Sequence, residues 1–119
     1  MTISQLTSKD FQFNNNSVKM APHIKGPGVL FLYANWCGAC TKTKPVFSQI
    51  EKLIGNRFNL TAIEESQIGN PVLANSLKIE YFPTIRFFDS NGTLSKNYTG
   101  PRDIDSLLNY ICNYYHTCQ

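Results

Sequence analysis

The sequence predicts an α/β domain in which helices flank a mixed central sheet. Residues 29–34 form a continuous apolar run without polar alternation, which is typical of a central strand covered on both faces. A long helical pattern follows from Cys37 to Ile54, and shorter strand and helix patterns continue to the end of the chain. This order of patterns favours a single layered α/β unit.

Length and composition indicate one domain with one core. The chain has 119 residues, 42% of them hydrophobic and 16% charged, and a net charge of +3. We divide it into an N-terminal strand and loop segment (1–28), a core (29–115) and a tail (116–119). The Lys and Arg residues are scattered, and no apolar run reaches the ~18 residues of a membrane span. We therefore expect no nucleic-acid partner, no membrane partner and a monomer.

The N-terminal segment contains two short alternating patterns. Phe11 and Phe13 alternate with a polar residue, Val18 and Met20 do the same, and an asparagine cluster lies between the two pairs. This pattern predicts a β-hairpin. The stretch just before it also offers Thr7 or Ser8 as the cap of a short helix.

Residues 22–28 contain two prolines and two glycines and are predicted to form a loop. We interpret His23, within this loop, as a solvated residue and not as a catalyst.

The long helix is predicted to begin at Cys37 and to end at Gly55, because glycine is a common residue just after a helix. Pro45 falls inside this helix, where a proline removes a backbone hydrogen bond and costs about 3 kcal/mol. The predicted apolar stripe comprises Val46, Phe47, Ile50, Leu53 and Ile54.

The remaining elements are predicted from local signals: a strand (58–63), a helix (70–77), a strand (79–88), a tight turn (89–92), a strand (93–98) and a last helix opened by Gly100 and Pro101.

Cys37 and Cys40 carry the clearest chemical signal of the chain. Two cysteines separated by two residues at the start of a helix, directly after a strand, are typical of a dithiol that exchanges with disulfides. The thiolate is the nucleophile, and a helix N-terminus favours an anion by roughly 0.3 to 2 kcal/mol. We therefore expect Cys37 to attack and Cys40, one turn further on, to resolve the mixed disulfide.

Two other interpretations of the pair were weighed. A structural zinc site needs four ligands, and neither the other cysteines nor the two histidines form a second ligand pair. A structural disulfide suits a secreted protein, yet residues 1–13 lack the basic and apolar regions of a secretory signal. We expect a cytosolic protein if the chain is complete, and a lumenal or virion-associated one if it is processed or otherwise targeted.

With these motifs, the chain resembles the thioredoxin superfamily and looks most like a catalytic domain of a protein disulfide isomerase. The motifs are Trp-Cys-Gly-Ala-Cys (36–40), Pro45 eight residues after the first cysteine, Phe-Pro-Thr (82–84) and Tyr-Thr-Gly-Pro-Arg (98–102). The resemblance covers residues 29–115 and implies the thioredoxin fold.

The resemblance also implies roles for single residues. Pro83 would follow a cis peptide bond and leave the backbone of Phe82 free to bind an extended substrate. Trp36 would shield the site and offer its face to substrate. Arg102 would be the mobile cation that helps the resolving cysteine to ionise.

Two positions depart from the family pattern. Phe31 stands where the family has a buried acid that moves protons to the resolving cysteine, so we expect slow resolution by Cys40. Glu64 is predicted to share a face with Leu60 and Ala62, and we hypothesise that it supplies the missing carboxylate. Otherwise it is simply the exposed end of a strand.

The residues beside the cysteines also depart from the pattern. Gly38 and Ala39 replace the Gly-Pro of thioredoxins and the Gly-His of isomerases, which predicts a reduction potential between the two extremes. Tyr81 replaces a glycine, which we expect to crowd the substrate groove.

We therefore predict an enzyme, a thiol–disulfide oxidoreductase that acts on protein or peptide substrates and is recycled by an unknown reductase or oxidase. It needs no cofactor beyond the Cys37–Cys40 disulfide, and no metal. The alternative is a non-catalytic peptide-binding adaptor with a slow dithiol. A metal- or cluster-bridged dimer through the cysteine pair is the third interpretation.

Cys112 and Cys118 are the remaining thiols. Six residues apart on a helix, they stand about 9 Å apart along the axis, beyond disulfide reach unless the tail unwinds. Cys112 is predicted to pack at the core edge. Cys118 is interpreted as an inert tail thiol, with an intermolecular disulfide as the alternative.

Overall fold

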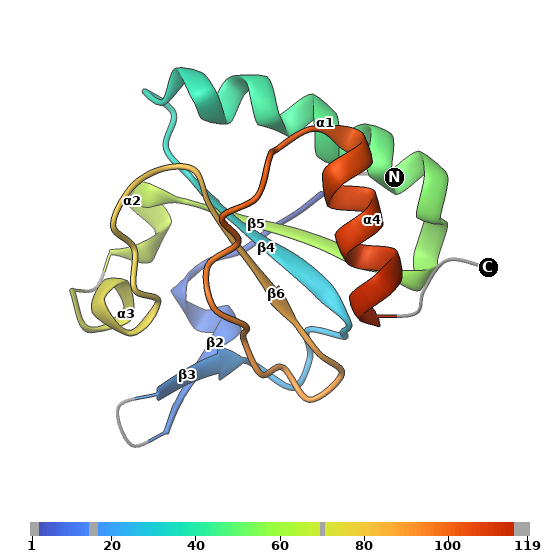
Figure 1. Ribbon diagram of the computed structural model, residues 1–119. Coiled ribbons are helices and arrows are strands. Elements are labelled where there is room, and N and C mark those ends of the chain that lie inside the picture. The colour runs from blue at the N-terminus through green and yellow to red at the C-terminus, as the bar shows by residue number, and fades with distance from the viewer. Residues whose placement is uncertain (1–2, 15–16, 70, 116–119) are drawn as a thin grey trace.

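A four-stranded sheet runs through the centre of the computed structural model, which describes residues 3–14, 17–69 and 71–115 (Figure 1). The strands lie in the order β1 (Ser4–Gln5), β5 (Asn59–Glu64), β4 (Gly28–Tyr33) and β6 (Thr84–Phe88). β5 pairs in parallel with β1 and β4, whereas β6 runs antiparallel to β4. The mixed sheet confirms the predicted fold class.

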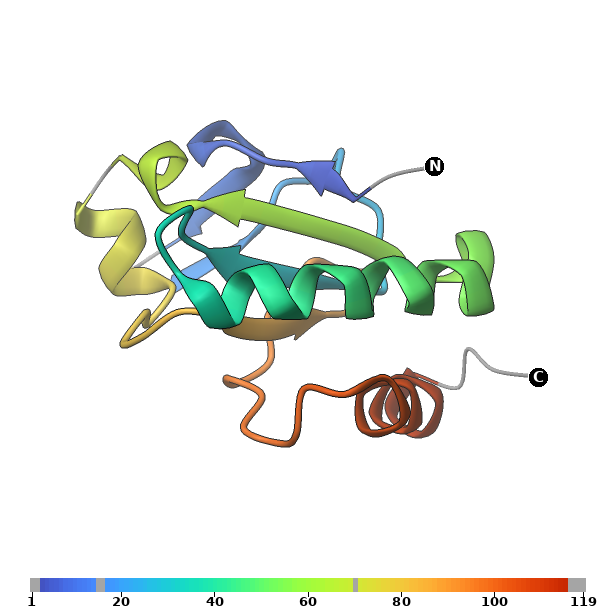
Figure 2. The ribbon, with the colours of Figure 1, turned by 90° about the horizontal axis from the view of Figure 1, so that it is seen from above.

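Helices and a hairpin cover the two faces of this sheet (Figure 2). The other elements are η1 (Ser8–Asp10), β2 (Phe11–Asn14), β3 (Ser17–Met20), α1 (Gly38–Ile54), η2 (Gly55–Arg57), α2 (Glu65–Ile68), α3 (Pro71–Ser76) and α4 (Ile104–Tyr115). α1 and α4 pack on one face, around Phe31, Phe47 and Leu107. The hairpin, α2 and α3 pack on the other face, around Leu30 and Leu73.

α1 begins and ends where the sequence predicts. Cys37 is its N-cap, and Gly55 follows its last residue with φ 73°, a conformation that favours glycine. Pro45 lies inside the helix, as predicted. Phe47 is buried as expected, but Leu53 is 59% exposed, so the predicted stripe is wrong at that position.

The N-terminal segment combines both predicted features. β2 and β3 form the predicted antiparallel hairpin, with Phe11 opposite Met20. Just before it, Thr7 caps η1 in a capping box with Asp10. The two-residue strand β1 is not foreseen from the sequence, because such a short segment carries no periodic signal.

His23 lies in the predicted loop with a side chain that is 60% exposed. Its Nε2 lies 2.6 Å from Oδ1 of Asp10, so the loop is tied to the end of η1.

The segment after β6 corrects the predicted strand at 93–98. The turn forms as expected, with Gly92 at φ 82°. Beyond it, however, only isolated bridges form, although the N–H groups of Ser95 and Tyr98 donate to carbonyls of β6. The hydroxyl of Ser95 accepts the N–H of Phe87, so a side chain occupies a place that a strand partner's backbone would take.

Two further differences concern the ends of elements. β6 starts at Thr84 and not at residue 79, because the chain turns through Phe82 and Pro83 before it enters the sheet. α2 was not predicted, and α3 begins at Pro71, the expected first helical residue.

A buried arginine fixes both flanks of β6. Arg86 is 8% exposed, and its guanidinium donates to the carbonyls of Leu77 (3.0 Å) and Ser95 (2.7 Å). Burial lowers the pKa of this guanidinium from its usual value. These bonds connect the end of α3 and the stretch after β6 to the same strand.

No helix in the described part of the chain is long and apolar enough to span a membrane.

Candidate active site

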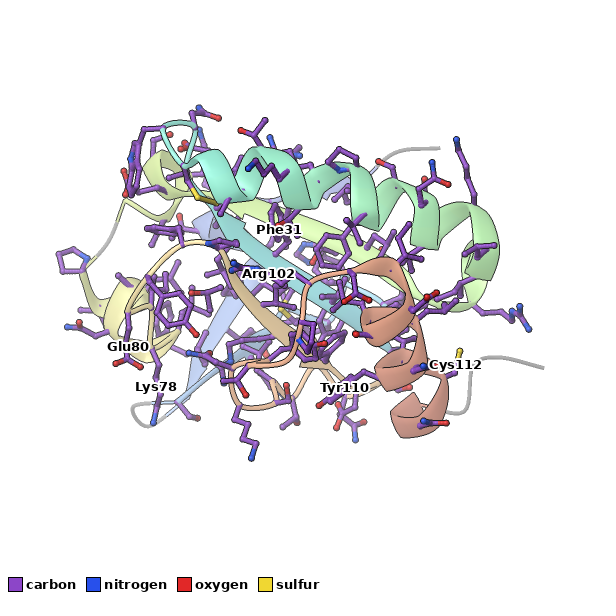
Figure 3. The ribbon with its side chains drawn as sticks, turned by 45° about the horizontal axis from the view of Figure 1, so that its top comes forward. Phe31, Lys78, Glu80, Arg102, Tyr110 and Cys112 are labelled. Atoms are coloured by element: carbon purple, nitrogen blue, oxygen red, sulfur yellow. A yellow bond between two sulfur atoms is a disulfide. The ribbon has the colours of Figure 1, made fainter. Side chains whose placement is uncertain are left out.

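Cys37 and Cys40 form a disulfide at the start of α1 (Figure 3). Their Cα atoms lie 5.3 Å apart, within the usual range for a disulfide. The pair follows directly from the route of the chain, because β4 ends at Tyr33 and a short turn places Cys37 at the helix N-cap. The predicted strand–turn–helix context of the pair is confirmed.

The start of α1 provides the electrostatic environment of Cys37. The backbone N–H of Cys40 donates to Sγ of Cys37 at 3.1 Å, so the first sulfur occupies the place of a capping acceptor. Cys37 is 7% exposed and Cys40 only 1%. The first sulfur is therefore the more accessible one and the one that a helix N-terminus stabilises as an anion.

Aromatic side chains form the rim of the site. Trp36 is 70% exposed, and its ring meets that of Phe82 edge to face at 5.8 Å. The indole N–H donates to Oε1 of Glu65 at 3.3 Å. The ring is thus held between α2 and the loop before β6, with most of its surface in solvent.

The loop before β6 places Phe82 and Pro83 beside this rim. The peptide bond between them is cis, as the resemblance implies. Within the described residues, the backbone N–H and C=O of Phe82 have no hydrogen-bond partner. An extended peptide can pair with such unpaired backbone groups.

Apolar side chains occupy the region behind Cys40. Phe31 is 1% exposed and packs against Tyr33 and Phe47, with ring centroids 5.4 and 5.2 Å apart. Figure 3 shows Phe31 beneath α1. Across residues 3–14, 17–69 and 71–115, no Asp or Glu is buried. Phe31 therefore places packed hydrocarbon where the family has its acid. Although no Asp or Glu is buried as a whole residue, one carboxylate oxygen of Glu51 is buried without a hydrogen-bond partner in the described part of the chain, and this residue lies further along α1 than Cys40.

Glu64 ends β5 at the same edge of the sheet but is occupied by other partners. Its carboxylate accepts the hydroxyl and N–H of Ser66 and the N–H of Asn35. These hydrogen bonds lower the pKa of Glu64 from its usual value, and the bond from the Ser66 hydroxyl has the largest effect. A proton relay at neutral pH needs a raised pKa, so this geometry argues against the relay hypothesis, which stays a prediction. What the structure does show is that Glu64 links α2 to the turn before Trp36.

Arg102 lies on the stretch that leads from β6 into α4 (Figure 3). It lines a cavity of about 450 Å³ together with Tyr81, Pro83 and Tyr98. Its predicted action on the resolving cysteine stays a prediction. Gly38 and Ala39 form the exposed first turn of α1 between the two cysteines.

Cys112 differs from its predicted role. It is partly buried on α4 and is itself disulfide-bonded, so it is not a free packing thiol. Cys118 lies outside the described residues. No group of three or more potential metal ligands occurs in the part of the chain that the structure describes.

Sequence reasoning missed Asn35 and Glu65. Asn35 positions the turn through its N–H, a backbone role that no side-chain pattern reveals. Glu65 holds the indole and begins α2, but the cap before it is Glu64, and glutamate is not among the favoured N-cap residues. The only available signal was the position of both residues directly after a strand.

The comparisons with known proteins agree with this geometry. The thioredoxin family model matches residues 4–113, so the chain belongs to the thioredoxin family. Among its relatives is protein disulfide-isomerase 1 of Dictyostelium discoideum, 33% identical over 99 residues, which are 79% of this chain and 27% of that protein. A protein disulfide-isomerase of Zea mays is 31% identical over 86 residues, 70% of this chain and 17% of that protein.

Solved structures share the fold at lower identity. The zinc-bound form of human ERp44 has a TM-score of 0.73 at 21% identity, covering 93% of this chain and 30% of that one. Chloroplastic thioredoxin z has a TM-score of 0.71 at 12% identity, covering 98% of this chain and 96% of that one. The aligned residues span less than a third of the length of the two isomerases.

Proposed function

We propose that the protein is a thiol–disulfide oxidoreductase that exchanges disulfides with protein or peptide substrates. The observation that carries the proposal is the Cys37–Cys40 disulfide at the N-terminus of α1, with the N–H of Cys40 directed at the first sulfur. A disulfide placed there has one sulfur favoured as a thiolate and a second within reach of it, which disulfide exchange requires.

The exchange proceeds in two balanced steps. The Cys37 thiolate attacks one sulfur of a substrate disulfide, and the other substrate sulfur leaves as a thiolate that takes up a proton. Cys40 then loses its proton and attacks Sγ of Cys37, which releases the second substrate thiol and closes the Cys37–Cys40 disulfide. Two electrons pass from enzyme to substrate. Of the two protons that the substrate thiols take up, one comes from Cys40 and the other from solvent, because Cys37 starts as the thiolate. Oxidation of a substrate dithiol is the reverse.

The second step is expected to be slower than the first. Cys40 is 1% exposed, Phe31 packs in the same apolar cluster, and burial disfavours the charged thiolate. Without an acid at position 31, the proton of Cys40 passes to water, to a substrate group or, under the relay hypothesis, to Glu64, and we expect the mixed disulfide to accumulate.

Insulin reduction tests the proposal. Pre-reduced protein with dithiothreitol as the reductant should precipitate the insulin B chain faster than dithiothreitol alone, and Cys37→Ser should return the rate to that background. An acceleration that survives Cys37→Ser would refute the assignment.

Equilibration with glutathione buffers measures the Cys37–Cys40 potential. With alanine at position 39, we expect a value between the about −270 mV of reducing members of this fold and the about −120 mV of strongly oxidising ones. A value at either extreme contradicts that expectation.

The rim of the site and Phe31 favour the alternative, a peptide-binding adaptor with a slow dithiol. The unpaired backbone of Phe82 and the exposed ring of Trp36 are suited to bind a peptide, whereas Phe31 removes the acid that speeds resolution. An adaptor would bind a cysteine-free peptide as tightly as its cysteine-containing counterpart and would not accelerate insulin reduction.

A further inference from the structure

A second feature of the site lies on the side of Pro83 that faces α4. There a cavity of about 450 Å³ is walled by Tyr81 and Tyr98, with Pro83 and Arg102 also in its lining. None of the residues that line it is an Asp or a Glu. The cavity therefore offers a cation and two aromatic walls next to the loop that we propose binds substrate.

The chain that carries Arg102 is held firmly. The Tyr98 hydroxyl donates to the carbonyl of Pro101 at 2.6 Å. A Cβ at position 100 would lie 2.6 Å from that hydroxyl, so only glycine fits there. The Tyr98 ring packs in turn on Phe87 and Tyr110, with centroids 5.9 and 5.3 Å away. The base of the arginine is thus fixed to the core, whereas its side chain is exposed.

Arg102 has no acidic partner within the described residues. Its neighbour Asp103 accepts the N–H and hydroxyl of Ser106 at 2.8 and 3.0 Å, which commits that carboxylate to the first turn of α4. The guanidinium keeps all its donors available for a ligand, and its planar fork matches a carboxylate.

We propose that this cavity is a specificity site for a carboxylate carried by the substrate polypeptide, an Asp or Glu a few residues from the cysteine that Cys37 attacks. The inference rests on the proposed function and adds a substrate class to it. A polypeptide is the favoured source of this carboxylate, because Phe82 also lines the cavity and its unpaired backbone suits an extended chain. A peptide paired at that point extends past the cavity and brings its neighbouring side chains over Arg102.

The test isolates the attack step. In a Cys40→Ser background, reduced Cys37 attacks the sulfur of a peptide cysteine that is activated as a 2-pyridyl disulfide. The peptide forms a mixed disulfide with Cys37, and the displaced pyridine-2-thione is followed by its absorbance. A set of peptides carries Glu in turn at each of the three positions on either side of the cysteine, and a matched set carries Gln. Without Cys40, any action of Arg102 on the resolving thiol is removed from the measurement.

With Arg102 present, we expect a Glu peptide at the best position to react about tenfold faster than its Gln counterpart at subsaturating peptide, the size of one charge-assisted hydrogen-bonded pair. Arg102→Gln should abolish the difference, and Arg102→Lys should restore part of it. Arg57→Gln is the matched control, because it removes the same charge just past the end of α1, about 25 Å along that helix from Cys37, and should keep the difference.

Three results would overturn the inference. The inference fails if the Glu and Gln peptides react at equal rates, or if Arg102→Gln slows both sets by the same factor. Either result would show that the arginine does not bind a peptide carboxylate. An arginine-dependent gain seen only with the pyridyl disulfide of glutathione would assign the site to a small acidic thiol. The proposed function fails separately, if no peptide reacts faster with Cys37 present than with the Cys37→Ser protein.

Discussion

The two sides of the disulfide differ in exposure and polarity. We call the rim of Trp36 and Phe82 beside Cys37 the front, and the apolar cluster that contains Cys40 the back. At the front, Trp36 is 70% exposed, Phe82 has an unpaired backbone, and the helix N-terminus points an N–H at Cys37. At the back, Cys40 packs in the same apolar cluster as Phe31 and Phe47. Under the proposed function, the front is the side that meets the substrate, whereas the back is an apolar cluster with Phe31 in place of the family's acid. In the proposed exchange reaction, the attack step therefore depends on the exposed rim, and the resolution step depends on the buried apolar cluster.

The largest effect should separate the two cysteines. Cys37→Ser removes the nucleophile and should lower the rate of insulin reduction by about 10³-fold or more, to background. Cys40→Ser should also stop turnover, yet it should leave Cys37 able to attack and so accumulate a covalent mixed disulfide with substrate. Mass spectrometry after acid quenching detects this species. If Cys40→Ser traps nothing and Cys37→Ser does, the assigned roles are reversed.

The next effect concerns the missing acid. Phe31→Asp should speed resolution of a preformed mixed disulfide at pH 7 by about tenfold or more over Phe31→Asn, because only Asp can accept the Cys40 proton. Both variants should lose about 3–5 kcal/mol of unfolding free energy, because a buried Phe is replaced by a small polar side chain. Quenched-flow measurement of the mixed disulfide provides the rate, and equal rates for Asp and Asn would show that proton removal does not limit resolution.

A smaller effect is expected at the front. Trp36→Ala should lower kcat/KM for insulin by about tenfold, the loss typical of an aromatic contact at a binding surface. Its unfolding free energy should change by less than about 0.5 kcal/mol, because the ring is mostly exposed. Urea denaturation together with the insulin assay measures both quantities. A large loss of stability with little loss of activity would contradict the division between front and back.

The smallest effect belongs to Glu64. Because hydrogen bonds to Ser66 and Asn35 lower its folded pKa, its ionised form stabilises the fold above the unfolded value near 4.5. That contribution is lost as the pH falls through the folded pKa. Glu64→Gln should therefore reduce the unfolding free energy at pH 7 by about 0.5 kcal/mol, and the difference should be smaller at pH 3, below the unfolded pKa.

Urea titrations of both proteins at the two pH values measure this difference. The same variant tests the relay hypothesis, through the pH dependence of Cys40 alkylation. An unchanged profile shows that Glu64 only positions the turn, and a shifted profile shows that it exchanges protons with Cys40.

The core of the fold was predictable because its signals are local. The apolar run of β4, the Cys37 N-cap, the Gly55 stop and the alternating hairpin each follow from short patterns, and the structure has all four. The predicted strand at 93–98 fails because Ser95 and Arg86 take hydrogen bonds that a ladder would need, and such competition between side chain and backbone is invisible in a propensity.

The candidate site was predictable to the same extent. The cysteine pair and Pro83 belong to contiguous motifs, and the structure places them as expected. The hydrogen bond from Asn35 to Glu64 arises where the end of β5 meets the turn before α1, and the two residues are 29 positions apart in the sequence. No local pattern encodes that meeting, so the hydrogen bond from Asn35 to Glu64 could not be predicted, and the relay role of Glu64 stays a prediction.

Arg86 has a mechanical consequence for the site. Its guanidinium donates to the carbonyl of Leu77, just after α3, and the chain beyond Pro83 continues directly into β6, so the loop around Phe82 is attached to β6 at both of its ends. A polypeptide that bound at this loop would therefore pull on the central sheet through both ends of the loop. A lysine at position 86 would carry its charge on a single nitrogen and could not donate to the carbonyls of both Leu77 and Ser95 with the same planar geometry.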